Sequence, residues 1–395
     1  MKPNISTHEQ LIDWLAAPQP AVFLKLDLRS YGARIAAAPL NGCAFIGCWI
    51  DTDFWGKAAE AGCMILPPIP RLDAAPFDPY TIALYTTEEL YGGYDPLDLA
   101  TKDAYFDRRV YLTFMDSSRQ ILPVPFDVML LRRMHDATVA AALEPIVEQY
   151  GDKIVAIMGG HDRSRKDNIY KQVAWMALQL TQSGYMIATG GGPGLMEAGN
   201  LGAYCAGFAD PARTLTRALD ALADGGFDPE KPDWDLWLKD CFTVLKAMGK
   251  PTDQAKSRNL GIPTWFYGHE PPNMFATDIA KYFENSVREE GLLAIARAGV
   301  IYAEGNGGTV QEIFQDACQN YYRNYAKSKS PMILFGSDYW NPDEMEFDQP
   351  KTDKRKKVYP LLKKLATEKE FFDYLYITDS ADETINFILN HPPAP

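Results

Sequence analysis

One stretch of the chain, residues 185–200 (YMIATGGGPGLMEAGN), limits the possible folds more than any other. Its apolar start is typical of a buried strand, and a glycine-rich loop with one proline follows before a helical sequence begins. Glycine permits positive φ and close approach of the backbone to a ligand, and proline suits the first turn of a helix. Because a helix N-terminus presents free N–H groups and a positive dipole end, the pattern predicts a phosphate-binding loop. The alternative is a tight strand-to-helix turn without a ligand.

A second stretch, residues 299–312 (GVIYAEGNGGTVQE), repeats this pattern of strand, glycine loop and helix. Two such loops at the carboxyl ends of two strands indicate one nucleotide site in an open parallel sheet. Neither loop matches the dinucleotide pattern G-x-G-x-x-G, and no Lys-Ser/Thr pair follows the glycines as in a Walker A loop. The loop residues predicted to bind phosphate or substrate are Gly190, Gly191, Gly192 and Gly194 in the first, and Gly305, Asn306, Gly307, Gly308 and Thr309 in the second.

From residue 153 onward, short apolar runs alternate with helical segments, which predicts an α/β fold with a doubly wound, Rossmann-like parallel sheet. A helical insertion is expected at residues 208–258, a further strand at 261–267, and a long helix at 278–297. Residues 1–150 are expected to form a smaller N-terminal α/β domain, a candidate regulatory unit, and 151–395 the nucleotide-binding domain. The N-terminal strands are expected at 22–26, 43–49 and 109–114. No internal repeat is evident.

Composition excludes several classes of function. The chain has 39 basic and 52 acidic residues and a net charge of −13, which argues against binding a nucleic acid polymer. The six cysteines and five histidines lack the spacing of metal sites, so no metal is expected. The first residues lack the apolar core of a signal peptide, and no apolar run approaches the ~18 residues that suggest a membrane span. A cytoplasmic protein without membrane contact is therefore expected.

The two glycine motifs together resemble those of the LOG family, long described as lysine decarboxylases. GGGPGLMEAGNLGA at residues 190–203 resembles the first family motif, and EGNGGTVQE at 304–312 resembles the second, P-G-G-x-G-T-x-x-E. Within the family the likeness is greater to the bacterial nucleotide 5′-monophosphate nucleosidases, on the further evidence of GGH at 159–161 and EPPN at 270–273. Two residues depart from the second motif, since Glu304 replaces a proline and Asn306 a glycine.

This resemblance, which covers roughly residues 150–390, implies an activity. The reaction is hydrolysis of the N-glycosidic bond of a nucleoside 5′-monophosphate, giving free base and ribose 5-phosphate. The family also implies a homodimer or larger homo-oligomer, and no cofactor is expected. A non-catalytic nucleotide sensor, or a carrier of a phosphorylated cofactor, is the alternative. Intact Glu312 and Arg288 favour the hydrolase, whereas Glu304 and Asn306 favour the sensor.

Two residues are the candidates for catalysis. Cleavage of an N-glycosidic bond passes through an oxocarbenium-like state, which needs a nearby negative charge, a positioned water and help for the departing base. By the resemblance, Glu312 supplies the charge or orients the water, and Arg288 holds the substrate and orients Glu312. Each has a plain alternative: Thr309 and Glu312 have the spacing of a capping box, and Arg288 has that of an i,i+4 ion pair with Glu284 on a solvated helix face.

The remaining candidates also have two interpretations each. Glu197 is placed by family position at the ribose, although an acidic residue in a first helical turn also suits the helix dipole. Asn273 of the EPPN turn is a candidate for substrate contact. A basic cluster after the first strand of this domain either receives phosphate or lies in solvent; its members are His161, Arg163, Arg165 and Lys166. Three tryptophans either stack on a base or pack in the core; they are Trp234, Trp237 and Trp265.

Overall fold

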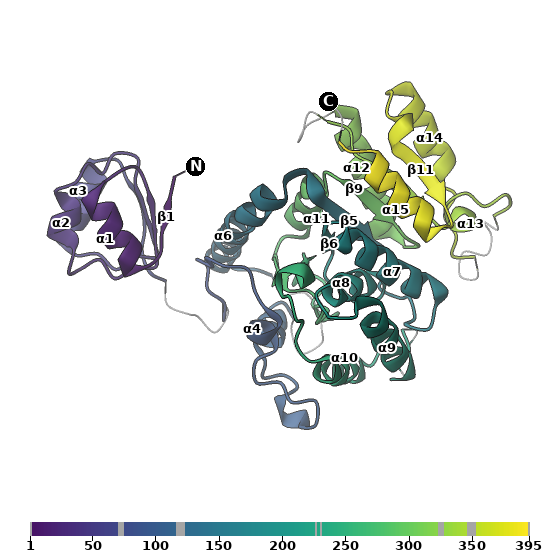
Figure 1. Ribbon diagram of the computed structural model, residues 1–395. Coiled ribbons are helices and arrows are strands. Elements are labelled where there is room, and N and C mark those ends of the chain that lie inside the picture. Colours follow the sequence, from purple (N-terminus) through teal and green to yellow (C-terminus); the bar gives the residue numbers. More distant parts are fainter. Residues whose placement is uncertain are drawn as a thin grey trace. The chain divides into compact units, whose positions relative to one another are not determined.

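The computed structural model describes residues 2–69, 75–115, 123–225, 227–229, 231–322, 328–345 and 353–393 (Figure 1). The chain forms two compact units. The first comprises Met1–Ala83 and Pro123–Ala142, and the second comprises Leu84–Leu122 and Leu143–Pro395. Helix α6 (Phe126–Tyr150) contributes to both. The expected boundary near residue 150 therefore differs from the division that the structure makes.

Residues after position 84 belong to the second unit because of long-range contacts. The backbone of Tyr85 exchanges two hydrogen bonds with that of Ile279, at N–O distances of 2.8 and 2.9 Å. The ammonium of Lys281 and the indole N–H of Trp265 both donate to the carboxylate of Asp107, at 2.5 and 2.9 Å. All three of these side chains are buried. This buried ion pair, together with the indole hydrogen bond, joins the segment around Asp107 to the residues that flank β7 and β8.

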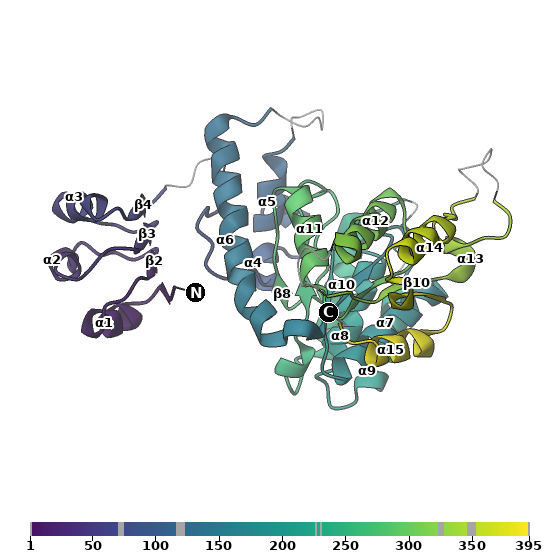
Figure 2. The same cartoon turned by 90° about the horizontal axis from the view of Figure 1, so that it is seen from above.

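The first unit contains a four-stranded parallel sheet in which the strands follow chain order. Figure 2 shows its three helices on one side of the sheet. The strands are β1 (Asn4–Ile5), β2 (Val22–Leu24), β3 (Ala44–Ile46) and β4 (Met64–Leu66), and the helices are α1 (His8–Ala16), α2 (Gly32–Ala36) and α3 (Thr52–Glu60). The α/β character expected for this region is present.

The register of this sheet reveals an internal repeat that the sequence did not indicate. Asn4 pairs with Val22, Val22 with Ala44, and Ala44 with Met64, so the strands recur every 18 to 22 residues. Lys25 and Gly47 occupy equivalent positions just after their strands, and both have positive φ, 54° and 64°. Of the paired positions in β2 and β3 only Phe23 and Phe45 are identical, whereas the positive φ after the strand recurs. A search for similar residues therefore misses the repeat.

The second unit contains a seven-stranded parallel sheet in the order β11-β10-β9-β5-β6-β7-β8. The chain moves outward from β5 through β6, β7 and β8, then returns to the other side of β5 and continues through β9, β10 and β11. The strands are β5 (Ile154–Met158), β6 (Met186–Thr189), β7 (Leu260–Gly261), β8 (Asp278–Ile279), β9 (Gly299–Tyr302), β10 (Met332–Phe335) and β11 (Leu375–Thr378). The direction of winding changes between β5 and β9, as in a doubly wound, Rossmann-like fold.

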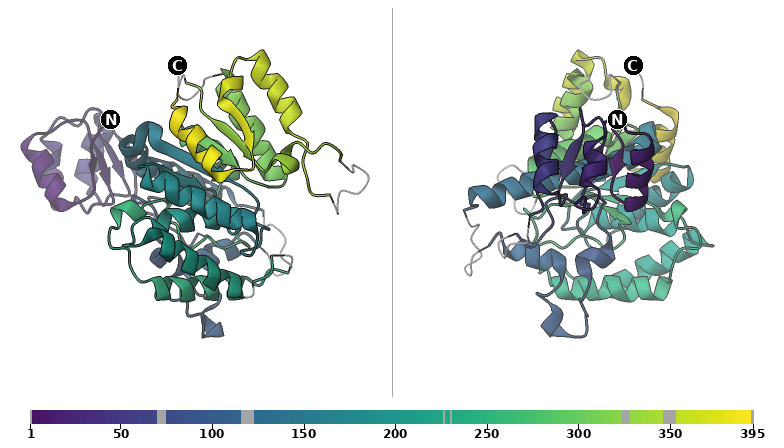
Figure 3. Two further views of the ribbon diagram at one scale, coloured as in Figure 1. Left: turned by 45° about the vertical axis from the view of Figure 1, so that its right-hand side comes forward. Right: turned by 90° about the vertical axis from the view of Figure 1, so that its left-hand side faces the viewer.

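Helices cover both faces of this sheet (Figures 2 and 3). One face carries α7 (Asn168–Gln182), α8 (Leu195–Cys205) and α15 (Ala381–Asn390), and the other carries α11 (Asn285–Ile295), α12 (Gly307–Tyr322) and α14 (Tyr359–Glu368). The expected insertion contains α9 (Pro211–Asp224) and α10 (Trp234–Met248). Shorter helices are α4 (Thr87–Tyr91), α5 (Phe106–Leu112) and α13 (Ser337–Trp340). None of the described helices is long and apolar enough to cross a membrane.

Three expected elements differ from the structure. The strand expected at 109–114 is largely helix α5, which buries Asp107, Val110 and Tyr111. The helix expected from residue 278 begins as strand β8, and α11 starts only at Asn285. The strand expected at 261–267 is limited to Leu260–Gly261. At 109–114 and 261–267 tertiary packing overrides the local preference of aromatic and branched residues for strands, because β-propensity depends strongly on context. At 278–279 the chain instead pairs with β7 before the helix begins.

Candidate functional site

The loops after three adjacent strands meet at one edge of the large sheet. Strands β9, β5 and β6 are neighbours and parallel, so the segments after their carboxyl ends lie at the same edge. Backbone hydrogen bonds join them, since Gly160 N donates to Glu304 O at 2.8 Å and Leu195 N donates to Gly160 O at 3.1 Å. The two glycine loops thus border one region at the switch point, as the alternation of strands and helices predicted.

The first glycine loop has a backbone that only glycine fits. Gly191 and Gly194 have positive φ of 71° and 67°. A Cβ at Gly194 would lie 2.4 Å from Gly160 O, and one at Gly191 would lie 2.7 Å from Pro263 Cδ. Neither neighbour can move easily, because one is backbone and the other is a proline ring. Close packing alone therefore requires glycine at these positions.

A buried network of polar side chains holds the first loop in place. Thr189 Oγ1 accepts from Gly191 N at 2.9 Å and donates to Asn200 Oδ1 at 2.6 Å. Asn200 Nδ2 donates to Asn259 Oδ1 at 2.7 Å. The side chains of Thr189, Asn200 and Asn259 have no exposed surface. Buried amides that satisfy one another specify a single loop conformation. Asn200 and Asn259 were not predicted, and their only sequence signal is a polar residue inside apolar surroundings.

Asn273 belongs to the same network, which corrects its predicted role in substrate contact. Its backbone N–H donates to Gly191 O at 2.8 Å, and Nδ2 donates to Gly192 O at 3.2 Å and to Asn200 Oδ1 at 2.8 Å. Its Oδ1 accepts from the backbone N–H groups of Phe275 and Ala276, both at 3.2 Å. With both amide atoms in use and the side chain buried, Asn273 positions the loop.

The second glycine loop is more open. Helix α12 begins at Gly307, so Thr309 lies inside the first turn and the capping-box interpretation is wrong. Thr309 Oγ1 instead lies against Gly305, 2.2 Å from where a Cβ there would be. A Cβ at Gly307 or at Gly308 would meet no described atom within 4 Å. The start of this helix thus has room for a ligand to approach its backbone.

Glu304 and Asn306, the two residues that depart from the second motif, both contact the loop after β5. The Glu304 carboxylate lies 3.1 Å from Arg163 Nη2, and Asn306 Nδ2 donates to Asp162 Oδ2 at 3.2 Å. Asparagine adopts a left-handed backbone more readily than most residues, but Asn306 does not have positive φ. Since the guanidinium neutralises Glu304, this carboxylate adds little net repulsion toward an anion at the loop.

Arg288 and Glu312 meet beside the first glycine loop. Both side chains are buried, and Arg288 Nη1 lies 3.9 Å from Glu312 Oε1. The same Nη1 is 3.2 Å from the position of a Cβ at Gly190. Arg288 Nη2 donates to Asn285 Oδ1 at 2.8 Å and lies 3.3 Å from Glu289 Oε1. The alternative of a solvated ion pair with Glu284 is therefore not adopted, and the guanidinium links the two loops.

The carboxyl of Glu312 titrates near neutrality. Burial raises its pKa to about 7, the nearby Arg288 opposes this rise, and Glu289 adds to it. Glu289 is itself held by Gln311 Nε2, which donates to its Oε2 at 2.8 Å. A carboxyl with a pKa close to the working pH is suited to accept a proton from a water molecule.

A second partly buried carboxyl, that of Glu270, faces the first loop from the side of Gly192. Its Oε1 lies 3.5 Å from His161 Nε2 and 3.6 Å from His269 Nε2. Its Oε2 lies 4.0 Å from the position of a Cβ at Gly192. Burial raises the pKa of Glu270, and the two imidazoles oppose this. The EPPN turn was singled out in the sequence for Asn273, but its first residue is the one with titratable chemistry at the loop.

Glu197 has a structural role, which corrects the predicted ribose contact. Its side chain has no exposed surface. Arg165 donates to both of its oxygens, at 2.8 and 2.9 Å, and the Tyr170 hydroxyl donates to one of them. Arg165 also lies 3.3 Å from Asp240. A carboxylate saturated by two buried partners fixes the helix start rather than binding a ligand.

The predicted basic cluster does not form a cationic surface. Arg165 is buried against Glu197, Arg163 pairs with Glu304, and His161 lies beside Glu270. Lys166 is exposed. The tryptophans follow the packing alternative: Trp237 and Trp265 are buried, and Trp234 packs edge-on against Trp237 with ring centroids 6.1 Å apart. Within the described residues, no three His, Cys, Asp or Glu side chains are grouped to hold a metal ion.

No family model matches this sequence, and no curated protein matches it. Among solved structures, the molybdenum cofactor binding protein from the phototrophic bacterium Rippkaea orientalis is similar to this chain. The match covers 60% of this chain and 94% of that protein's chain. The two share 14% identity with a TM-score of 0.34. A likeness this low carries no argument about the site or the ligand of this chain.

Proposed function

We propose that this protein is a nucleoside 5′-monophosphate phosphoribohydrolase of the LOG type, which releases a free base and ribose 5-phosphate. One observation carries the proposal: Arg288 Nη1 lies beside the first glycine loop, 3.2 Å from where a Cβ at Gly190 would be, and 3.9 Å from Glu312, the catalytic candidate that follows the second loop. A phosphosugar needs an anion cradle and a cation, and its anomeric carbon needs a nearby carboxylate. The cation lies beside both the loop and the carboxylate.

Substrate binding follows from the two loops. The phosphate lies over the backbone of the second loop, where Gly307 and Gly308 leave open space at the start of α12. N–H groups at a helix start, together with its dipole, stabilise a dianion. Arg288 then holds the ribose phosphate from the side of the first loop, and its contact keeps Glu312 aimed at the sugar.

The reaction uses one carboxyl on each side of the first loop. Glu312 in its ionised form takes a proton from a water molecule, whose oxygen adds to the anomeric carbon as the N-glycosidic bond breaks. Glu270 in its protonated form, with His161 and His269 beside it, donates a proton to the departing base. The negative charge of Glu312 also stabilises the oxocarbenium-like transition state. One buried and one partly buried carboxyl, both with raised pKa values, suit these opposite tasks.

We also propose a homodimer or larger homo-oligomer in a reducing, cytoplasmic compartment. The family resemblance motivates the assembly. The compartment is supported by six cysteines that are all free, four of them buried. Light scattering at micromolar concentration tests the assembly, and a monomer would contradict it.

Incubation of the purified protein with a panel of nucleoside 5′-monophosphates tests the function. Chromatography should detect a free base and ribose 5-phosphate in equal amounts from at least one nucleotide. The non-catalytic sensor predicts nucleotide binding by calorimetry with no base released from any member of the panel. Binding without release would therefore replace the hydrolase by the sensor.

A further inference from the structure

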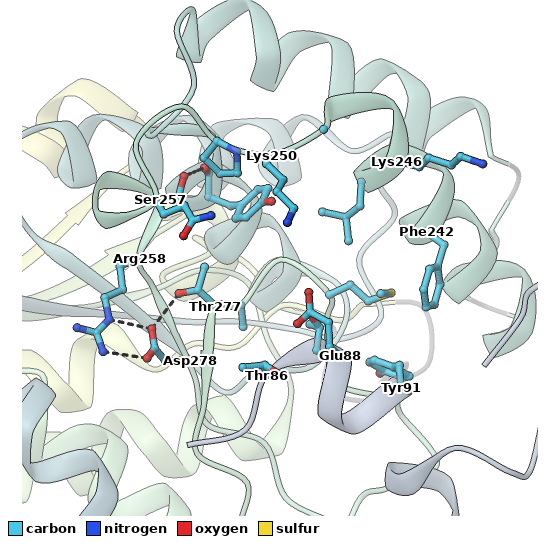
Figure 4. Close-up of a pocket in the computed structure, with 18 of the residues that line it drawn as sticks. Thr86, Glu88, Tyr91, Phe242, Lys246, Lys250, Ser257, Arg258, Thr277 and Asp278 are labelled. Carbon is cyan, nitrogen blue, oxygen red and sulfur yellow. Dashed lines mark hydrogen bonds and ion pairs between the residues drawn. The ribbon is translucent and has the colours of Figure 1, made fainter. Parts of the chain in front are cut away.

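A cavity of about 940 Å³ lies in the second unit, apart from the glycine loops (Figure 4). Its walls come from helix α4, the end of α10 and the segments that lead into β7 and β8. Three of the lining residues come just before a strand: Ser257 and Arg258 precede β7, and Thr277 precedes β8. The cavity therefore lies at the amino ends of these strands, whereas both glycine loops follow the carboxyl ends of strands. None of the residues that contact the first loop in the site above lines it. Its volume is in the range of small-molecule sites.

The walls are mostly apolar and include several aromatic rings. The apolar and aromatic residues that line the cavity are Tyr91, Tyr204, Phe242, Leu245, Met274 and Ala276. Tyr91 and Phe242 pack edge-on with ring centroids 6.3 Å apart, so this part of the wall is ordered by its own contacts. A flat apolar ligand gains most from such a surface, because aromatic walls bury a ring on its face.

Two charged side chains face the middle of the cavity from opposite walls. In Figure 4, Lys250 and Glu88 point inward, whereas Lys246 points away. Arg258 and Asp278 neutralise each other through two hydrogen bonds of 2.9 and 3.0 Å. In the described part of the chain, neither Lys250 nor Glu88 forms an ion pair. The cavity therefore offers one unpaired cation and one unpaired anion across an aromatic wall.

We propose that this cavity binds a small aromatic zwitterion of the amino-acid type. Lys250 receives the carboxylate and Glu88 receives the ammonium, while the ring lies among the aromatic residues of the wall. Charge-assisted hydrogen bonds to both charged groups on the α-carbon give such a ligand an advantage over a molecule with only one charge. Both side chains are exposed, and Glu88 Oε2 accepts a hydrogen bond from the neighbouring Thr87 hydroxyl at 3.3 Å, so each charge exchanges water for a ligand group at low cost.

Residues that line the cavity are linked to the first glycine loop through the turn at residues 272–274. Tyr91 Oη donates to Pro272 O at 2.5 Å, and Met274 lines the cavity. Between them lies Asn273, which binds the backbone of Gly191 and Gly192. A ligand that stabilises this turn stabilises the loop, and the coupling is reciprocal. This link rests on the proposed function, whereas binding in the cavity does not.

Calorimetric titration with three probes tests the site on the intact protein. L-tryptophan should bind more tightly than tryptamine, which lacks the carboxylate, and than indole-3-propionate, which lacks the ammonium. Lys250→Met should weaken tryptophan binding about tenfold and leave tryptamine unchanged, the scale of one charge-assisted hydrogen bond. Glu88→Gln should weaken tryptophan similarly and leave indole-3-propionate unchanged.

Lys246→Met is the matched control, since it removes the same charge from the same helix end but from a side chain that points away. It should bind tryptophan as wild type does. Absence of tryptophan binding up to millimolar concentration would overturn the proposal. So would equal affinities of wild type, Lys250→Met and Glu88→Gln for tryptophan.

Titration with ribose 5-phosphate tests the link. Saturating tryptophan should tighten ribose 5-phosphate binding about fivefold, and ribose 5-phosphate should tighten tryptophan binding by the same factor. The same affinity with and without tryptophan would overturn the link alone. If ribose 5-phosphate does not bind at any tryptophan concentration, the proposed function and the link both fail. The tryptophan titrations then still test whether the cavity binds an aromatic amino acid.

Discussion

The two glycine loops border one site, yet they are built in different ways. In the first loop a Cβ at any of Gly190, Gly191, Gly192 or Gly194 would lie within 2.8 Å of a neighbouring atom. The buried side-chain amides of Asn200, Asn259 and Asn273 hold this loop through hydrogen bonds. In the second loop, a Cβ at Gly307 or Gly308 would meet no described atom within 4 Å, and the loop is held by pairs near the surface.

This difference changes what a glycine motif reveals. Gly191 and Gly194 of the first loop are required by positive φ and by rigid neighbours, so their presence is explained without any ligand. Glycines at the start of α12 have no such packing requirement, and a helix turn is more stable with alanine. Their presence is therefore the stronger sign that something approaches the backbone. The less conspicuous motif in the sequence carries more evidence of function.

The largest expected difference is in the stability of two alanine variants. Gly194→Ala should lower the free energy of unfolding by about 3 kcal/mol, because φ is 67° and the new methyl would meet Gly160 O. Gly308→Ala should change it by less than about 0.5 kcal/mol. Urea unfolding measures both. Equal losses would show that the two loops are not built differently.

The second expected effect is on catalysis by the carboxyl of the open loop. Glu312→Gln keeps the shape but removes the charge, so kcat should fall at least ~100-fold, the scale of one aimed electrostatic group, with KM little changed. Asp316→Asn is the matched control, because burial also raises the pKa of Asp316 to about 7. The Tyr302 hydroxyl donates a hydrogen bond to Asp316 Oδ2 at 2.8 Å, so this carboxyl already has a partner within the protein. That variant should retain its kcat. Wild-type turnover by Glu312→Gln would show that the assignment is wrong.

The third effect separates the carboxyls on the two sides of the first loop. Glu270→Gln should lower kcat on nucleotides about 100-fold, the lower range for general acid catalysis. With 4-nitrophenyl ribofuranoside 5-phosphate, whose leaving group needs no proton, Glu270→Gln should match wild type and Glu312→Gln should remain impaired. A loss by Glu270→Gln that is equal on both substrates would contradict its role as the acid.

The fourth effect compares the two asparagines that hold the loops. Asn273→Ala should lower the free energy of unfolding by about 2 kcal/mol, because it leaves buried partners without hydrogen bonds. Asn306→Ala removes one exposed contact and should change the free energy of unfolding by less than about 0.5 kcal/mol. Thermal and urea unfolding of the pair provide the measurement. A larger loss from Asn306→Ala would reverse the comparison.

The smallest effect is the pH dependence of turnover. Glu312 must be ionised to act, and its pKa of about 7 lies above the ordinary value, so kcat should fall as pH decreases through 7. Between pH 7 and pH 6 the ionised fraction falls about fivefold, and kcat should follow it. Profiles of kcat at saturating nucleotide check this, and Asp316→Asn should keep the same profile. A flat profile between these pH values would contradict the role of Glu312.

The alternation of strands and helices was enough to predict the large sheet and the meeting of both glycine loops. It is a local property, since the length of each apolar run and the glycine or proline that ends it lie within a few residues. The parallel arrangement then places every carboxyl end at one edge. The insertion expected at residues 208–258 contains helices α9 and α10. The repeat of the first unit was missed because its copies share backbone conformation more than residue identity.

The sequence by itself determined which segments reach the site, and the tertiary structure decided what each side chain does there. Glu197 and Glu312 both follow glycine loops, but only the first is saturated by Arg165 and Tyr170. Glu270 became a candidate because His161, more than a hundred residues away, lies beside it. The role of a carboxyl depends on its burial and on the partners that fill its hydrogen bonds, and these come from distant parts of the chain.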